Sequence, residues 1–549
     1  MNTNRRKFIQ NAGLSAAALT LTTPGIASPR GNAEKDGQIL FVGDNIAVAS
    51  TAYGKVRGFI LRGINTFLGI PYGADTSGAN RFMPPVKPKP WTEVLPAVWW
   101  GNTAPQNMEN RYANAYSSFI DHWNYDDVSE DCLKLNIWTP AINDGKKRPV
   151  MFWLHGGGYT NGNAIEQDGY HGENFSRKGD TVFVSINHRL GPLGFTYFGE
   201  AGEKFAASGN VGMLDCVAAL EWVRDNIANF GGDPGNVTIM GQSGGAGKVC
   251  VLTAMPSAKG LFHKAVALSG ASLKAIEKPN AEKLASYVLK EAGLTYNDME
   301  KVQQMPWKQY YEFATRALAK YREEMNLPMF GGGGGFAPMV DGTHLPQHPY
   351  NGEPAASAAS VPMLICSTFN EQSPSRTDST LENIDVTGVK EKLKDRFGAK
   401  AADIVDAYTK AFPEKRPIEI WSMIASNRQN AVALADAKAK QTADVFVAWF
   451  GWQPPLFDNR MRAFHCADIC FWFNNTDVML THTGGGSRPR KLSEKMSGAL
   501  LSFMRTGNPN SGSLPKWPAY TSTNGETMIL DDNCAVKNDP DREARKSFV

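Results

Sequence analysis

Short, nearly continuous apolar runs recur through the middle and later parts of the chain. Residues 150–154 read Val-Met-Phe-Trp-Leu, and residues 181–187 form a second run that is rich in β-branched side chains. Both runs have the length of a buried strand. Similar runs predict strands at 237–240, 265–268 and 363–366, and an alternating run predicts another at 445–450.

A helix is predicted between the second and third of these strands. Residues 212–229 place six apolar side chains at helical spacing: Met213, Leu214, Val217, Leu220, Trp222 and Val223. The segment Phe230-Gly231-Gly232-Asp233-Pro234 then supplies strong helix breakers. Strands that alternate with helices in this way indicate an α/β fold with a mostly parallel sheet covered by helices on both faces. Functional sites in such sheets lie beyond the carboxyl ends of the strands.

A glycine-rich run, Thr-Ile-Met-Gly-Gln-Ser-Gly-Gly-Ala-Gly-Lys at 238–248, follows one of these strands directly. A phosphate-binding loop would need four residues between its first glycine and the Gly-Lys pair, followed by Ser or Thr. Here five residues separate Gly241 from Gly247, and Val249 follows Lys248. The run instead matches G-x-S-x-G, in which Ser243 stands at the tip of a strained strand-to-helix turn. We therefore predict Ser243 to be a nucleophile rather than part of a nucleotide site.

A second glycine segment suits the same chemistry. His155-Gly156-Gly157-Gly158 follows the strand at 150–154 and precedes Ser243 in the chain. Backbone N–H groups in a glycine loop can point at the oxyanion that forms during ester cleavage, and each can lower the barrier by about 3–4 kcal/mol. The alternative is a plain flexible turn.

A serine nucleophile requires a base and an acid that orients the base, here in the order Ser, acid, His. Two histidines, His465 and His482, lie well past an acid at a strand end. We favour His465, because His482 lies in a polar loop with no adjacent predicted strand. For the acid we favour Glu371, just beyond the strand at 363–366, over Asp378, which lies further into a Ser/Thr-rich loop.

The composition limits the other possibilities. The 549 residues and 42% hydrophobic content suffice for one large domain with elaborations or for two to four smaller ones. The mean hydropathy is −0.33, and no apolar stretch is long enough to span a membrane. Seven cysteines do not form a disulfide framework, and buried thiols are favoured over a metal site at Cys466 and Cys470, which lack a second ligand pair.

The N-terminus predicts export. Paired arginines, Arg5 and Arg6, precede a mild apolar stretch and a small-residue segment at 25–27, which is typical of a twin-arginine signal; the alternative is an ordinary secretion signal. We expect residues 1–27 to be the signal, residues 28–47 a linker, and the mature protein to be periplasmic or extracellular. Loss of residues 1–27 removes three cations and no acid, so the formal charge falls from +3 to 0. No basic field then remains to favour a nucleic-acid partner.

Several motifs in one order resemble the type B carboxylesterases, relatives of the cholinesterases and of bacterial p-nitrobenzyl esterases. They are Phe67–Tyr72 with Arg81-Phe82, Ser129–Asn136, His155–Gly158, Asn187–Gly191, Phe230–Pro234, the Ser243 turn, Val340–Gly342, Glu371, Ala463–His465, Gly507–Asn510 and Trp517-Pro518. The similarity covers most of the chain after about residue 48.

This resemblance implies an α/β-hydrolase fold in one large domain, 48–549, with helical insertions around an active-site gorge. It implies Ser243 as nucleophile, Glu371 as acid and His465 as base, without cofactor or metal. Gly157, Gly158 and the N–H of Gly244 would form the oxyanion hole. The resemblance also implies a small-molecule ester as substrate.

The sequence departs from the family pattern at three places. Gln242 and Gly244 stand where the family usually has Glu and Ala, which should alter the field around His465 and loosen the turn. No cysteine precedes Cys132, so the family's usual bridge at that position is absent.

Some alternatives stay open on sequence alone. The same triad serves lactonases, thioesterases and amidases, and some relatives keep the fold as non-catalytic binding proteins. The aromatic residues in 305–335 suit either an acyl pocket or ordinary helix packing, and Gly331–Gly335 suits either a gating loop or a spacer. The substrate and the oligomeric state are not encoded in any pattern that we recognise.

Overall fold

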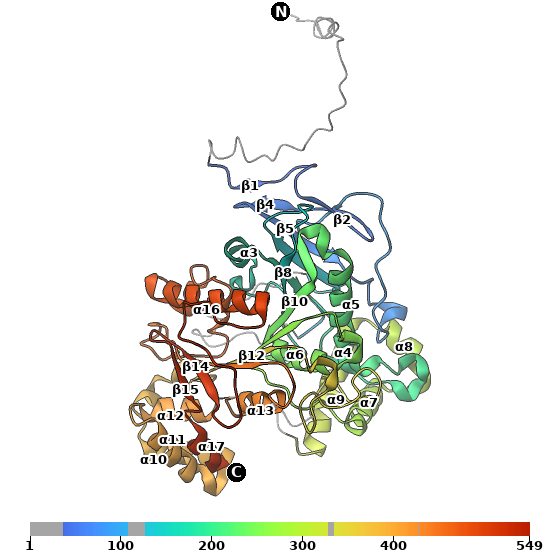
Figure 1. The fold of residues 1–549 in the computed structure, drawn as a ribbon. Helices are drawn as coiled ribbons and strands as arrows, with labels where there is room; N and C mark the ends of the chain where they lie inside the picture. Colours follow the sequence, from blue (N-terminus) through green and yellow to red (C-terminus); the bar gives the residue numbers. More distant parts are fainter. Residues whose placement is uncertain (1–36, 108–126, 328–333, 427, 549) are drawn as a thin grey trace, which may run out of the picture.

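The structure is a computed structural model that describes residues 37–107, 127–327, 334–426 and 428–548 (Figure 1). The predicted export signal at 1–27, residues 28–36 of the predicted linker, and Gly331–Gly333 lie outside the described residues.

A twelve-stranded sheet runs through the part of the chain that the structure describes (Figure 1). In the order in which the strands lie side by side, every neighbouring pair from β9 (Val182–Ile186) through β8 (Arg148–Leu154) to β14 (Glu526–Leu530) is parallel. The pairs nearer both edges are antiparallel. The predicted mostly parallel sheet is thereby confirmed. In spatial order the strands are β1 (Leu40–Phe41), β4 (Phe59–Leu61), β5 (Ile64–Pro71), β7 (Lys134–Thr139), β9 (Val182–Ile186), β8 (Arg148–Leu154), β10 (Gly232–Gln242), β11 (Lys264–Leu268), β12 (Met363–Thr368), β13 (Val445–Phe450), β14 (Glu526–Leu530) and β15 (Ala535–Asn538). A small second sheet contains β2 (Val48–Thr51), β3 (Gly54–Arg57) and β6 (Leu95–Pro96).

All six predicted strands are present, as β8 to β13, and the predicted helix is α5 (Val211–Asn226) followed by a 3₁₀ turn, Ile227–Phe230. Most strand boundaries differ from the predicted ones by one or two residues, and one differs by more. β10 begins at Gly232, five residues before the predicted start, because Gly232 pairs with Arg148 before an irregularity that ends at Val237. The segment that we expected only to end the helix therefore also opens the next strand.

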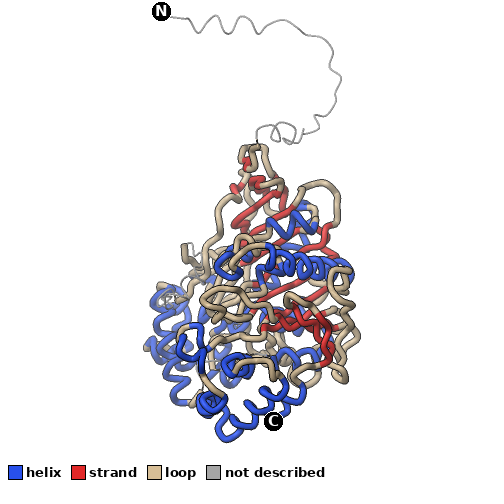
Figure 2. Tube along the Cα trace, turned by 90° about the vertical axis from the view of Figure 1, so that its left-hand side faces the viewer, coloured by secondary structure: helices blue, strands red, loops and turns tan. Residues whose placement is uncertain are grey.

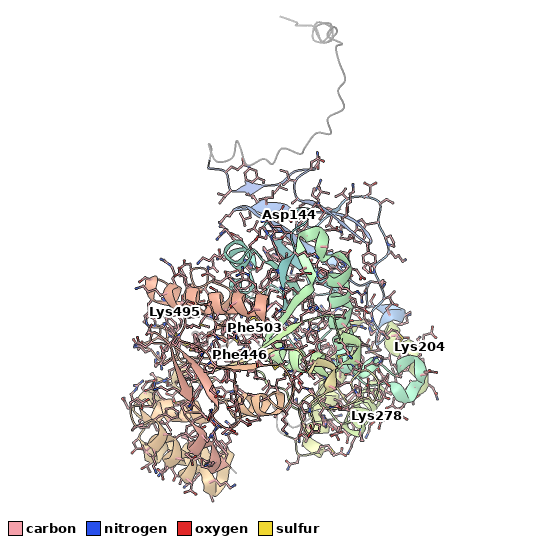
Figure 3. The ribbon with its side chains drawn as sticks, in the orientation of Figure 1. Asp144, Lys204, Lys278, Phe446, Lys495 and Phe503 are labelled. Atoms are coloured by element: carbon pink, nitrogen blue, oxygen red, sulfur yellow. The ribbon has the colours of Figure 1, made fainter. Side chains whose placement is uncertain are left out.

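Helices cover both faces of the sheet, and β8 illustrates the division. Val150, Phe152 and Leu154 pack into one core cluster with α5 and α6 (Gly244–Ala254). Met151 and Trp153 pack into another core cluster with α16 (Ser487–Thr506). Alternate side chains of a strand point to opposite faces, so a strand covered on both sides is apolar throughout. On the α16 face, the Phe446 and Phe503 rings meet edge to face at 6.3 Å (Figure 3).

The remaining helices lie around this sheet, as Figure 2 also shows. Two groups are insertions, with α7 to α9 between β11 and β12 and α10 to α12 between β12 and β13. The bounds are α3 (Glu173–Gly179), α4 (Gly191–Phe195), α6 (Gly244–Ala254), α7 (Lys278–Ala292), α8 (Met299–Gln304), α9 (Trp307–Glu324), α10 (Val386–Phe397), α11 (Ala401–Ala411), α12 (Pro417–Ile424), α13 (Arg428–Lys438), α14 (Ile469–Trp472), α15 (Leu480–Thr483), α16 (Ser487–Thr506) and α17 (Arg542–Arg545). Among the described helices, none combines the length and hydrophobicity needed to cross a bilayer.

Candidate active site

Ser243 occupies a strained turn between β10 and α6. Its backbone has φ 56° and ψ −123°, in a region that L-residues rarely adopt, and its N–H donates to Leu268 O at 2.8 Å. The turn is possible because Gly241 and Gly245 flank it. A Cβ on Gly241 would lie 2.3 Å from Gly245 C, and one on Gly245 would lie 2.1 Å from Leu154 O. The sequence thus fixes a turn that presents Ser243 at the carboxyl edge of the sheet.

The glycine loop lies beside this turn. β8 pairs with β10 so that Leu154 stands opposite Gly241, and this register brings the residues after both strands to the same edge. Gly244 and Gly158 approach so closely that a Cβ on Gly244 would lie 2.1 Å from Gly158 O. Within the described residues, the N–H groups of Gly157, Gly158 and Gly244 donate to no protein acceptor. These three donors are therefore available to a ligand.

Glu371 and His465 form a hydrogen-bonded pair. The Oε2 atom of Glu371 lies 2.5 Å from Nδ1 of His465, and its Oε1 atom accepts from the Thr368 N–H at 3.0 Å. The backbone joins the same segments, because the His465 N–H donates to Glu371 O at 3.2 Å. Glu371 is only 5% exposed. The carboxylate is thus fixed at the end of β12 and holds one tautomer and one orientation of the imidazole.

Gln242 contacts the other side of the same imidazole. Its Nε2 atom lies 3.1 Å from Nε2 and 3.4 Å from Nδ1 of His465, so the amide contacts both ring nitrogens. Among the described residues no hydrogen bond joins the Ser243 hydroxyl to His465. Catalytic hydrogen bonds in ligand-free enzymes are often long and tighten when substrate binds. The predicted departure at Gln242 therefore acts directly on His465.

The pKa of His465 reflects opposing influences. Burial disfavours the charged ring, but the neighbouring Cys466 and Glu371 outweigh burial and raise the pKa well above its usual value. A carboxylate in contact stabilises the imidazolium, which is the form that the ring takes after it accepts a proton.

The two rejected candidates lie elsewhere. Asp378 is exposed, and its carboxylate accepts from Thr380 N at 3.0 Å at the start of a 3₁₀ turn. His482 does not lie in a polar loop as expected, because it is buried within α15 and packs edge to face against Phe464 at 5.1 Å.

The aromatic region of α9 separates into two environments. Tyr310 is buried in the core, where its hydroxyl donates to Thr196 Oγ1 at 2.8 Å, so it serves helix packing. A cavity of about 720 Å³ lies beside the glycine loop, and Leu318 and Arg322 of α9 line it together with Gly158, Tyr159 and Thr160. The aromatic residues of α9 do not line this cavity; they are Trp307, Tyr310, Tyr311, Phe313 and Tyr321.

The cysteines form no disulfide. Five of the seven, Cys132 included, are buried. No cluster of three or more possible metal ligands occurs within the described residues.

One buried residue near the turn was overlooked in the sequence. Once a phosphate loop is excluded, the sequence predicts no role for Lys248. In the structure its side chain is fully buried and donates to His155 O at 2.9 Å. Its place five residues after Ser243 was the one available signal.

Comparison with known proteins places these features in a family. The family model described as "Carboxylesterase family" matches residues 45–548. The chain belongs to the carboxylesterase family. It is 32% identical over 510 residues to the para-nitrobenzyl esterase of Bacillus subtilis, covering 91% of this chain and 98% of the relative. It is 31% identical over 505 residues to the phenmedipham hydrolase of Pseudarthrobacter oxydans, covering 89% and 96% respectively.

Solved structures agree with this assignment and with the α/β-hydrolase fold. An esterase from Clostridium hathewayi, described as able to hydrolyse aliphatic aromatic polyesters, superposes with a TM-score of 0.79 at 32% identity, covering 92% of this chain and 99% of that one. A Geobacillus stearothermophilus carboxylesterase superposes with a TM-score of 0.75 at 33% identity, covering 92% and 100%. Membership of the carboxylesterase family supports carboxylic-ester hydrolysis as the activity of this chain.

Proposed function

We propose that this carboxylesterase is a cofactor-independent serine hydrolase in which Ser243, His465 and Glu371 act as nucleophile, base and orienting acid. The observation that carries the proposal is the convergence of four strand ends. The glycine loop follows β8, the Ser243 turn follows β10, Glu371 follows β12, and His465 lies beyond β13 and is hydrogen-bonded to Glu371.

In the first half-reaction, Ser243 Oγ attacks the ester carbonyl carbon while His465 Nε2 takes the hydroxyl proton. The carbonyl oxygen becomes an oxyanion, for which Gly157, Gly158 and Gly244 offer N–H groups. The C–O bond then breaks, and the alcohol leaves with the proton held by His465. The acyl group remains on Ser243.

In the second half-reaction, water replaces the alcohol. His465 takes a proton from water, which attacks the acyl carbon through a second oxyanion. The acid leaves, and the proton returns to Ser243. Glu371 keeps the Nδ1–H of His465 in place throughout, so Nε2 always faces the reaction.

The test is hydrolysis of p-nitrophenyl esters from acetate to decanoate, by the natural sequence and by Ser243→Ala. Ser286→Ala is the matched control, because the Ser286 hydroxyl is exposed and donates only to Lys283 O at 2.7 Å. We expect the loss of Ser243 to lower kcat about 10⁶-fold, as loss of a triad nucleophile does, and the control to be fully active. Full activity in Ser243→Ala would show that another residue is the nucleophile.

The relatives guide the choice of substrate class. They are named for a para-nitrobenzyl ester, for phenmedipham and for aliphatic aromatic polyesters. We therefore propose that esters with an aromatic group on the acid or the alcohol are among the substrates. Matched thioesters and anilides in the same assay would reveal thioesterase or amidase activity on the same triad.

We also propose that residues 1–27 direct the chain out of the cytoplasm, on the basis of the Arg5-Arg6 pair and the small residues at 25–27. Fractionation of expressing cells, with Arg5 and Arg6 both changed to Lys, tests this. Retention of the variant in the cytoplasm is the expected result.

A further inference from the structure

Lys248 is a buried lysine close to the proposed oxyanion hole. Its side chain has no exposed surface, and Nζ makes a single hydrogen bond within the described residues, to the His155 carbonyl oxygen at 2.9 Å. Glu166 favours the charged form of this lysine from a distance, and burial opposes it more strongly. Burial of an ammonium with one neutral acceptor costs folding free energy, so a contribution to stability does not explain why a lysine occupies this position.

The contact joins two elements of the site. Lys248 lies on α6, whose first turn presents Ser243, whereas His155 opens the glycine loop. The two elements are as close as backbones allow, because a Cβ on Gly245 would lie 2.1 Å from Leu154 O and 2.8 Å from His155 O. Lys248 spans this junction between the nucleophile helix and the loop.

The peptide group that Lys248 holds is the first of the loop. The His155 carbonyl and the Gly156 N–H share one planar unit, so fixing the carbonyl fixes the direction in which the chain enters Gly157 and Gly158. Both of those glycines have left-handed backbones, with φ 79° and 65°. A loop of consecutive glycines has no side chains of its own to hold it, so its donors depend on such anchors.

We propose that Lys248 is a positioning residue that holds the glycine loop in its reactive geometry through the His155 carbonyl. This inference rests on the proposed function, because it assigns a role in the same reaction. Lys248 does not touch the substrate. It acts through the placement of the Gly157 and Gly158 N–H groups.

The surroundings of Lys248 make its charge sensitive to pH. Burial lowers its pKa to about 8, although Cys216 of α5 and Glu166 favour the charged form. The stacked rings of His155 and His188 also face it, and burial and the Lys248 charge keep the pKa of each ring well below its usual value. These rings are therefore neutral near pH 7. As the pH rises through about 8, the ammonium becomes an amine, a weaker donor to the carbonyl.

The test compares Lys248→Met with Lys438→Met. Lys438 is a matched control, since it is also buried, donates to Ala358 O at 2.8 Å and has a pKa lowered to about 8 by burial. It precedes β13, at the opposite end of the strands from the site. Both variants replace a buried amine with an apolar chain of similar length, so each removes a buried charge and leaves a buried carbonyl oxygen without its lysine donor.

The measurements are kcat and KM for p-nitrophenyl butyrate against pH, inhibition by phenylboronic acid, and thermal unfolding. Boronic acids form tetrahedral anionic adducts with serine nucleophiles and so occupy the oxyanion hole. We expect Lys248→Met to lower kcat about 10- to 100-fold, below the 10²–10³ for loss of a whole donor, with KM little changed. Boronate affinity should fall in parallel, and the decline of kcat above pH 8 should disappear. Lys438→Met should keep the natural kcat, boronate affinity and pH profile, and the unfolding temperatures of the two variants should be similar to each other.

The outcomes separate this inference from the function on which it rests. Loss of activity in Ser243→Ala, together with unchanged kcat, boronate affinity and pH profile in Lys248→Met, would overturn the role of Lys248 alone. Activity that survives in Ser243→Ala would overturn both. If Lys248→Met does not fold, Lys248→Leu, which also lacks a donor to the His155 carbonyl, takes its place, and an unchanged kcat and boronate affinity in that variant contradict the role.

Discussion

The close approach of Gly244 to the glycine loop gives a sharp prediction for Gly244→Ala. This change installs the residue that the family usually carries after the nucleophile. Here, a Cβ on Gly244 would lie 2.1 Å from Gly158 O, 2.3 Å from Gly158 Cα and 2.4 Å from Gly158 C. Cβ atoms essentially never approach other heavy atoms within 3.0 Å, so the Gly158 peptide must retreat by the difference of about 0.9 Å or more.

A retreat of this size matters because oxyanion donors work at 2.7–3.1 Å. Displaced by about 0.9 Å, the Gly158 N–H would no longer bond the oxyanion. The loss of one donor costs about 2.7–4 kcal/mol, or about 10²–10³ in kcat. We therefore expect Gly244→Ala to lower kcat by that factor with little change in KM, because the bond forms chiefly in the transition state.

The assay is steady-state hydrolysis of p-nitrophenyl butyrate, with the acylation burst measured by stopped flow. Gly498→Ala in α16 is the matched control, because its nearest neighbours would lie 3.6 Å from the new Cβ and alanine favours a helix interior. A Gly244→Ala enzyme that keeps kcat within about threefold of the natural chain would refute the reasoning. It would mean that the loop relaxes without moving its donors.

The other predictions concern the pH dependence of the base. Glu371→Gln removes the carboxylate that raises the pKa of His465, so the acid limb of the kcat profile should move to lower pH, and kcat should fall roughly 10⁴-fold as the tautomer is lost; an unmoved limb would contradict this. Gln242→Glu places a carboxylate against the same ring, so the pKa of His465 should rise and the acid limb should move to higher pH, since the base works only when neutral. A limb that moves the other way, or stays in place in the absence of unfolding, would show that Gln242 does not face the ring in solution.

Much of the fold followed from local pattern. The strands β8 to β13 are short apolar runs, and the α5 helix has regular apolar spacing, so periodicity alone located them. The start of β10 did not follow, because pairing with β8 overrode the breakers Gly232 and Pro234. The α15 helix was missed for a similar reason, since its four residues gain their helical form from the packing of His482 against Phe464.

The candidate site also contains features that were predictable from local sequence and features that were not. The G-x-S-x-G turn was predictable because its steric requirement lies within five consecutive residues. Glu371 was favoured over Asp378 because it lies just beyond a predicted strand, and in the structure Glu371 is hydrogen-bonded to His465. The contact of Lys248 with His155 was not predictable, because nothing in the glycine-rich run indicates which carbonyl a buried amine will reach.

The sequence by itself determined the α/β class, the positions of six strands along the chain, the serine turn and the glycine loop, because each depends on a few adjacent residues and their backbone sterics. Only the tertiary structure decided which distant groups meet. Lys248 and His155 are 93 residues apart, Glu371 and His465 are 94 apart, and Gln242 and His465 are 223 apart. These contacts depend on the order and register of the parallel strands in the sheet. Both are set by packing over the whole sheet, including the segments that connect one strand to the next. A single residue of slip would carry every side chain to the opposite face.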